Sequence, residues 1–115
     1  MNYDLEERTA KFGENTVHFV GSLAKNEVNK ILINQIVRSA TSVGANYMEA
    51  NQASSKKDFK NKIGICRKEA NETKYWLRMI LSANKDNADG CRKLWKESHE
   101  LMLIFSKIFS SSNKD

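Results

Sequence analysis

The sequence predicts an all-α protein, an antiparallel up-down-up-down bundle of four helices, on three grounds. The 115 residues include no proline and only five glycines, whereas average usage would give roughly six prolines, so residues that break helices are nearly absent. Apolar residues recur at alternating spacings of three and four along four stretches, a period of about 3.5 residues that is typical of left-handed helix packing. The joints are only about four residues long, so consecutive helices must run antiparallel.

The first helix is expected over residues 4–24. Asp4 can cap its N-terminus, and Glu7 follows three residues later as in a capping box. One face, widened by Val20, carries Leu5, Thr9, Phe12, Thr16, Phe19 and Leu23. The pattern stops at Lys25–Val28, where a joint is expected.

The second helix is expected over residues 29–52, with Asn29 as its N-cap. One face carries Ile33, Ile36, Val37, Ala40, Val43, Gly44 and Tyr47. The small residues Ala40, Gly44 and Ala45 would allow a neighbouring helix to approach closely.

The third helix shows the clearest pattern and is expected over residues 56–83. Ser55 and Asp58 form a capping-box pattern at its start. Its apolar stripe consists of Phe59, Ile63, Cys66, Ala70, Thr73, Leu77 and Ile80. At 1.5 Å per residue the helix would be roughly 42 Å long.

The fourth helix is expected over residues 87–109, after a joint at residues 84–87. Its stripe consists of Cys91, Leu94, Trp95, Ser98, Met102, Phe105 and Phe109. Residues 1–109 would then form one domain, since 13.2 kDa is enough for a single core, and residues 110–115 would form a frayed tail.

No active site or metal site is recognisable in the sequence. Neither His18 nor His99 has a glutamate three residues before it, the spacing that metal sites in four-helix bundles use. Cys66 and Cys91 lie on apolar stripes, where a free cysteine behaves as a small buried hydrophobe. We therefore predict a protein that is not an enzyme and needs no cofactor.

The sequence also predicts a cytoplasmic protein without membrane association. The longest apolar run, Leu101–Phe105, is far shorter than the ~20 residues that span a bilayer. Met1–Glu7 is acidic and lacks the apolar core of a signal peptide. Two cysteines cannot form a disulfide framework.

Positive charge is concentrated on the third helix. Residues 54–85 hold nine basic and three acidic side chains, although the whole chain has a net charge of only +5. Five cations fall within about 40° of one another at 100° per residue, and we call this set the basic rail. The basic rail consists of Lys56, Lys60, Arg67, Lys74 and Arg78.

A row of cations of this length can follow a phosphate backbone, and the alternative is a solvated face that keeps the protein soluble. Because no aromatic residue lies on this stripe, we expect no base stacking and only weak sequence preference.

A second set of polar and large residues occupies another face of the second and third helices. It consists of Arg38, Asn46, Glu49, Ile65, Glu69, Glu72 and Trp76. Two structured faces on one helix indicate contacts beyond a single bundle, as in a homo-oligomer, and the alternative is exposure to solvent. Arg38 is expected to pair with Glu69 or Glu72, within one subunit or between subunits.

Two long segments, Arg38–Ala50 and Asp58–Leu77, carry a resemblance to a known family. Together with Tyr3–Thr9 and Leu101–Phe105 they resemble the bacterial 23S rRNA-intervening-sequence proteins over nearly the whole chain. The resemblance implies a small antiparallel bundle that assembles into a ring, typically a homopentamer. A related branch, the accessory protein of diversity-generating retroelements, is a basic pentameric barrel that binds nucleic acid and a reverse transcriptase.

Together, the residues and the resemblance predict an oligomeric bundle that binds RNA or DNA through its third helix. The rival interpretation is a protein–protein interaction scaffold whose basic face is only a solubilising surface. Salt dependence separates the two, because phosphate contacts weaken steeply as salt rises.

Overall fold

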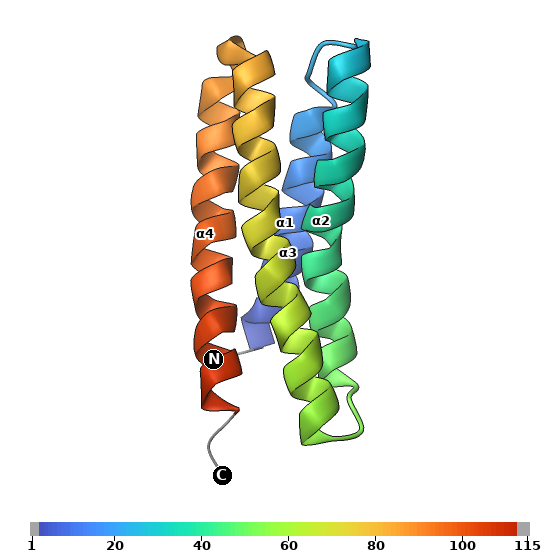
Figure 1. Ribbon diagram of the computed structural model, residues 1–115, viewed down its shortest axis with the longest axis vertical. Helices are drawn as coiled ribbons and strands as arrows, with labels where there is room; N and C mark the ends of the chain where they lie inside the picture. The colour runs from blue at the N-terminus through green and yellow to red at the C-terminus, as the bar shows by residue number, and fades with distance from the viewer. Residues whose placement is uncertain (1–2, 113–115) are drawn as a thin grey trace.

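The computed structural model describes residues 3–112 and contains four long α-helices (Figure 1). They are α1 (Tyr3–Val20), α2 (Glu27–Asn51), α3 (Lys56–Ala83) and α4 (Ala88–Ser111), and a short 3-10 helix, η1 (Lys85–Asn87), precedes α4. No strand occurs within the described part of the chain. The predicted all-α class with four helices is therefore confirmed.

The helices lie side by side along one axis, and the molecule measures 49 Å by 20 Å by 20 Å. The α1–α2 connection and the η1 turn lie at one end, and the α2–α3 connection lies at the other end (Figure 1). Each helix packs against its neighbours in sequence, and α4 also contacts α1. The four helices thus enclose one core.

The third helix has the predicted bounds, and its start is set by a local cap. The Ser55 side chain accepts a hydrogen bond from the backbone N–H of Asp58 at 3.0 Å. The predicted capping role of Asp4 lies outside the side chains that the structure describes.

The predicted boundary between the first two helices was wrong. α1 ends at Val20 and not at residue 24, although Leu23 is still buried in the connection. Asn26, not Asn29, caps α2, and its side chain accepts the Asn29 N–H at 2.8 Å. Asn29 instead exchanges two side-chain hydrogen bonds with Asn84, at 2.8 and 2.9 Å.

The end of the chain is more helical than expected. α4 begins at Ala88 and continues through Ser111, and the N–H of Ser112 donates to the carbonyl of Ile108 at 3.0 Å. The first residues of the predicted tail therefore belong to α4, and residues 113–115 lie outside the described part.

The predicted apolar stripes form the core, apart from a few positions at its margin. The largest fully buried side chains include Phe12, Ile36, Ile63 and Phe105. Trp95 departs most from its predicted core position, because it is 42% exposed. Buried hydroxyl groups bond to backbone carbonyls, as Ser98 does to Ala70 at 2.6 Å.

Gly44 allows the close helix approach that its size predicts. A Cβ atom on Gly44 would lie 3.3 Å from Thr9 Oγ1 and 3.4 Å from the Thr9 backbone. The α1 backbone therefore rests directly on α2 at this point.

Candidate nucleic-acid interface

The basic rail lies along the seam between α3 and α4, the two helices whose stripes meet there. Lys60 Nζ is 4.8 Å and Arg67 Cζ is 4.1 Å from the centroid of the Phe109 ring. Lys74 Nζ is 4.9 Å from the centroid of the Trp95 ring. Three cations of the rail are thus held by cation–π contacts with α4.

Glycine makes room for one of these rings. A Cβ atom on Gly64 would lie 3.0 Å from Phe109 Cε1, so the ring lies flush against α3. Phe109 in turn supports two cations that are seven residues apart on the same helix.

The α3 stripe that carries the rail has no aromatic residue, as predicted. Aromatic rings nevertheless lie beside the rail in the folded protein, because α4 brings Trp95, His99 and Phe109 alongside it. The Trp95 and His99 rings are stacked, with 5.1 Å between their centroids and an interplanar angle of 11°. Lys74 Nζ lies 2.9 Å from His99 Nδ1. The signal was present in the fourth stripe, where Trp95 and Phe109 were interpreted as core.

The remaining electrostatics of the seam are positive. Within the described residues, Arg67, Lys74 and Arg78 have no carboxylate at ion-pair distance. Lys56 and Arg78, at the ends of the rail, are exposed. The structure therefore places Lys60, Arg67, Lys74 and Arg78 against α4 on one edge of the bundle, and Lys56 lies on the same stripe of α3 one turn before Lys60.

The second predicted set is built around Arg38, which bridges α2 and α3 within one chain. Arg38 Nη1 donates to Glu69 Oε1 at 3.1 Å, and Nη2 contacts Glu72. Trp76 Nε1 donates to the same Glu72 carboxylate at 2.8 Å. Glu69 is 9% exposed, whereas the Arg38 side chain is 44% exposed. The predicted pairing therefore exists inside the bundle and is partly open to solvent.

The other members of this set lie along the same two helices. Lys62 Nζ donates to Glu49 Oε1 at 2.7 Å, and this hydrogen bond raises the pKa of Lys62. Asn46 donates to the Ser42 carbonyl of its own helix at 2.8 Å, and Ile65 is partly exposed. Only Arg38, Glu69, Glu72 and Trp76 are thus joined in one hydrogen-bonded cluster.

Sequence reasoning missed an ion cluster between α1 and α4. Arg8 donates to both oxygens of Glu97, at 2.7 and 2.8 Å, and to Glu100 at 2.9 Å. The hydrogen bonds to Glu97, and less so the one to Glu100, raise the pKa of Arg8. The spacing of Glu97 and Glu100 places both on one side of a helix, but nothing local names Arg8 as their partner.

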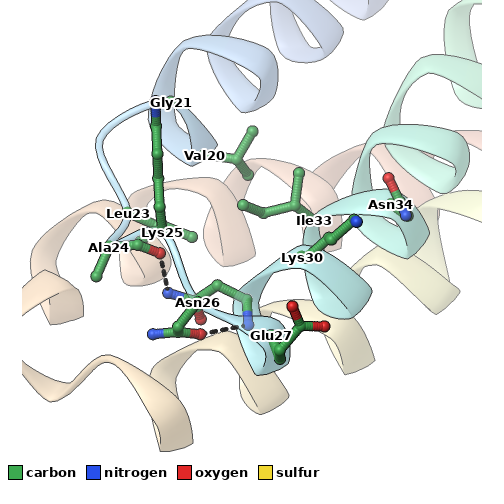
Figure 2. A pocket seen from close by; sticks show the side chains of 11 residues that line it. Val20, Gly21, Leu23, Ala24, Lys25, Asn26, Glu27, Lys30, Ile33 and Asn34 are labelled. Atoms are coloured by element: carbon green, nitrogen blue, oxygen red, sulfur yellow. Dashed lines mark hydrogen bonds between the residues drawn. The ribbon is translucent and has the colours of Figure 1, made fainter.

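A hollow of about 510 Å³ lies beneath the α1–α2 connection (Figure 2). Figure 2 shows Val20 and Ile33 directed toward each other within it. Asn29 Nδ2 donates to the Ala24 carbonyl at 2.7 Å, which ties the connection to α2. Within the described residues no buried side-chain nitrogen or oxygen lacks a hydrogen-bond partner, so no orphaned polar group marks a ligand here.

A second concavity, of about 600 Å³, runs between α1 and α2, and we call it the α1–α2 groove. Small residues line it, among them Gly13, Gly44 and Ala45, and so do the half-exposed Val17 and Met48. An exposed apolar concavity of this kind is typical of an interaction surface.

Metal and thiol chemistry find no support in the described residues. No group of three or more His, Cys, Asp or Glu side chains between residues 3 and 112 is placed to hold a metal ion. Cys66 and Cys91 are buried free thiols, and burial raises the pKa of Cys66 to about 12. A reactive nucleophile requires the opposite shift.

None of the helices described here combines the length and the apolar character that a bilayer span requires.

Comparison with known proteins agrees with this architecture. The family model of the 23S rRNA-intervening sequence protein matches residues 2–107. A crystal structure from Bacteroides thetaiotaomicron VPI-5482, a protein with unknown function from the S23 ribosomal protein family, is 34% identical to this chain with a TM-score of 0.80. The match covers 90% of this chain and 96% of that one. No curated protein matches the chain. With a match to this family over nearly its whole length, the chain belongs to the 23S rRNA-intervening sequence protein family.

Proposed function

We propose that this protein is a non-enzymatic, oligomeric helical bundle that binds RNA or DNA weakly, without strong sequence preference, through the basic rail. One observation carries the proposal. Four cations of the rail, Lys60, Arg67, Lys74 and Arg78, lie against α4, and among the described residues Arg67, Lys74 and Arg78 have no carboxylate partner.

The dimensions of the rail suit a phosphate backbone. Lys56 and Arg78 are 22 residues apart, which is roughly 33 Å along a helix. Phosphates of one strand advance about 3.4 Å each, so several lie within reach of the rail. The cation–π contacts hold Lys60, Arg67 and Lys74 in place, which reduces the entropy lost when they bind.

Assembly multiplies this weak interaction. The family resemblance implies a homopentameric ring of up-down-up-down bundles. Large apolar side chains left exposed on the single chain, including Val28, Ile31 and Leu103, supply surface that an assembly would cover. A ring presents several copies of the rail to one nucleic acid, and effective concentration then strengthens binding.

A scaffold for protein–protein interaction is the second candidate, and the α1–α2 groove favours it. The groove is apolar and lies on α1 and α2, away from the seam that carries the rail. In this alternative the rail serves only as a solvated surface.

A binding titration with the unmodified protein separates the two functions. We expect labelled single-stranded RNA, single-stranded DNA and duplex DNA to bind with micromolar or weaker affinity at low salt, and binding to collapse toward physiological salt. Fluorescence anisotropy at four or more salt concentrations measures the slope of log affinity against log salt. No binding to any of these probes at low salt would overturn the proposal and leave the scaffold.

A further inference from the structure

A small hollow lies in the α3–α4 seam, between the C-terminal part of α3 and the N-terminal part of α4. It has a volume of about 170 Å³ and is bounded by both helices. Its lining consists of Leu77, Arg78, Leu81, Cys91, Arg92 and Trp95. We call it the Trp95 hollow. Apolar side chains and one aromatic ring form the walls, and two guanidinium groups flank them.

The Trp95 ring is exposed to solvent and is not packed in the core. It is 42% exposed although it lies on the apolar stripe of α4. Its ring stacks against His99 at 5.1 Å, and Lys74 Nζ lies 4.9 Å from its centroid. These contacts fix the ring beside the hollow while a large part of its surface stays open to solvent.

The two arginines come from opposite sides of the seam, Arg78 from α3 and Arg92 from α4. Arg78 has no hydrogen bond or ion pair with any described residue. Arg92 has only a long contact of 3.8 Å with Asp89 on its own helix, and both side chains are largely exposed. Contacts of this kind are worth little, so both guanidinium groups are available to a phosphate.

We infer that the Trp95 hollow binds one unpaired nucleobase, which stacks on the indole of Trp95 while Arg78 and Arg92 bind the flanking phosphates. The inference rests on the proposed function and gives it a substrate class. A base in a duplex has both faces covered by its neighbours, whereas an unpaired base offers a face to an aromatic ring. The protein therefore prefers single-stranded or bulged nucleic acid to a duplex.

The test compares single strands with duplexes for the parent and for Trp95→Leu, which removes the ring at an exposed position. Probes are labelled oligo(dT), oligo(U) and a blunt DNA duplex, measured at one low salt concentration. Tyr75→Leu is the matched control, because it removes an aromatic side chain that is 54% exposed and does not line the hollow. Trp95→Phe retains a smaller ring.

We expect the parent to bind single strands more tightly than the duplex. Trp95→Leu should lower the ratio of single-strand to duplex affinity about tenfold, Trp95→Phe should lower it less, and Tyr75→Leu should leave it unchanged. If Trp95→Leu leaves the ratio of single-strand to duplex affinity unchanged while the protein still binds nucleic acid, the Trp95 hollow is not a base-binding site. If the parent binds neither single strands nor duplex, the proposed function itself fails.

Discussion

Glu69 is buried to 9% exposure on α3, and its carboxylate accepts a hydrogen bond from Arg38 at 3.1 Å. Removing one partner of a fully buried pair costs about 3–5 kcal/mol. Here the Arg38 side chain is 44% exposed and keeps its contact with Glu72. The charge left behind therefore remains solvated and partly paired.

We expect Glu69→Ala to lower the free energy of unfolding by about 1.5 kcal/mol, above the value for an exposed pair and well below that for a buried one. Urea unfolding measures the change, and Glu69→Gln, which keeps the shape, isolates the charge. A loss under about 0.5 kcal/mol would show that the pair is solvated, and a loss above about 3 kcal/mol would show a buried pair.

Cys66 makes stability depend on pH in the alkaline range. Burial raises the pKa of its thiol from 9.0 to about 12, so the folded state favours the protonated form. The stability from this group is complete below pH 9, the unfolded value, and is lost as pH rises toward 12. Its contribution falls by as much as about 1.4 kcal/mol per pH unit in that window.

Cys66→Ala lacks this group and should lose less stability between pH 8 and pH 10.5 than the parent. Denaturant unfolding of both proteins at a series of pH values gives the difference in free energy. A difference that stays constant across the series would contradict the burial of the thiol.

At the scale of elements, the contact between α1 and α2 depends on the missing side chain of Gly44. Gly44→Val places methyl groups against the Thr9 backbone, which the ideal Cβ already approaches to 3.4 Å. Overpacking of this kind costs about 1–3 kcal/mol. Ala45→Val is the control for a valine at an exposed position of the same turn. Helix propensity by itself favours Gly44→Val over this control by about 1 kcal/mol, because valine is a better helix former than glycine and a poorer one than alanine.

Urea unfolding should show Gly44→Val to be less stable than Ala45→Val, the reverse of the order that helix propensity gives. A Gly44→Val protein that is more stable than Ala45→Val by about 1 kcal/mol, the difference that propensity alone supplies, would mean that α1 does not rest on α2 at this position.

The ends of helices were predictable where the capping residue is chosen by its neighbours in sequence. They were not predictable where a residue far along the chain determines which side chain caps the helix. The Ser55 side chain accepts the N–H of Asp58, three residues later, so the start of α3 was correct. Asn26 and Asn29 both suit an N-cap, and the choice is made by Asn84, which is 55 residues from Asn29 and draws it into a buried pair. No local pattern contains that information.

In the candidate site, too, some features follow from local sequence and others depend on distant parts of the chain. The cations of the rail follow from charge and helical period alone. Their aromatic neighbours depend on how α4 is rotated against α3, which sets Phe109 over Arg67 and Trp95 beside Lys74. Periodicity reveals a stripe but not which of its members face a seam between helices, so Trp95 was predicted to be core.

At the scale of the whole molecule, assembly into a ring is the first expectation to test. The subunit is 13.2 kDa, and we expect a discrete species of five copies in sedimentation velocity, a number taken from the family resemblance. A monomer whose sedimentation does not change with concentration would contradict both the ring and the gain in affinity that it supplies.

The central claim is that the rail, and not the general positive charge, binds nucleic acid. The direct measurement is the salt dependence of nucleic-acid binding by a triple variant in which glutamine replaces Lys60, Arg67 and Lys74. Its control is the triple variant of Lys11, Lys25 and Lys30 to glutamine, which removes the same charge from exposed positions on α1, α2 and their connection. Circular dichroism and sedimentation confirm that helicity and assembly are kept in both.

We expect the rail variant to bind more weakly and to lower the slope of log affinity against log salt by about two, since each lost phosphate contact removes roughly 0.7–0.9. The control should stay within about half a unit of the parent slope. Equal affinities and equal slopes for the parent and the rail variant would contradict the claim and leave the rail as a solvated face.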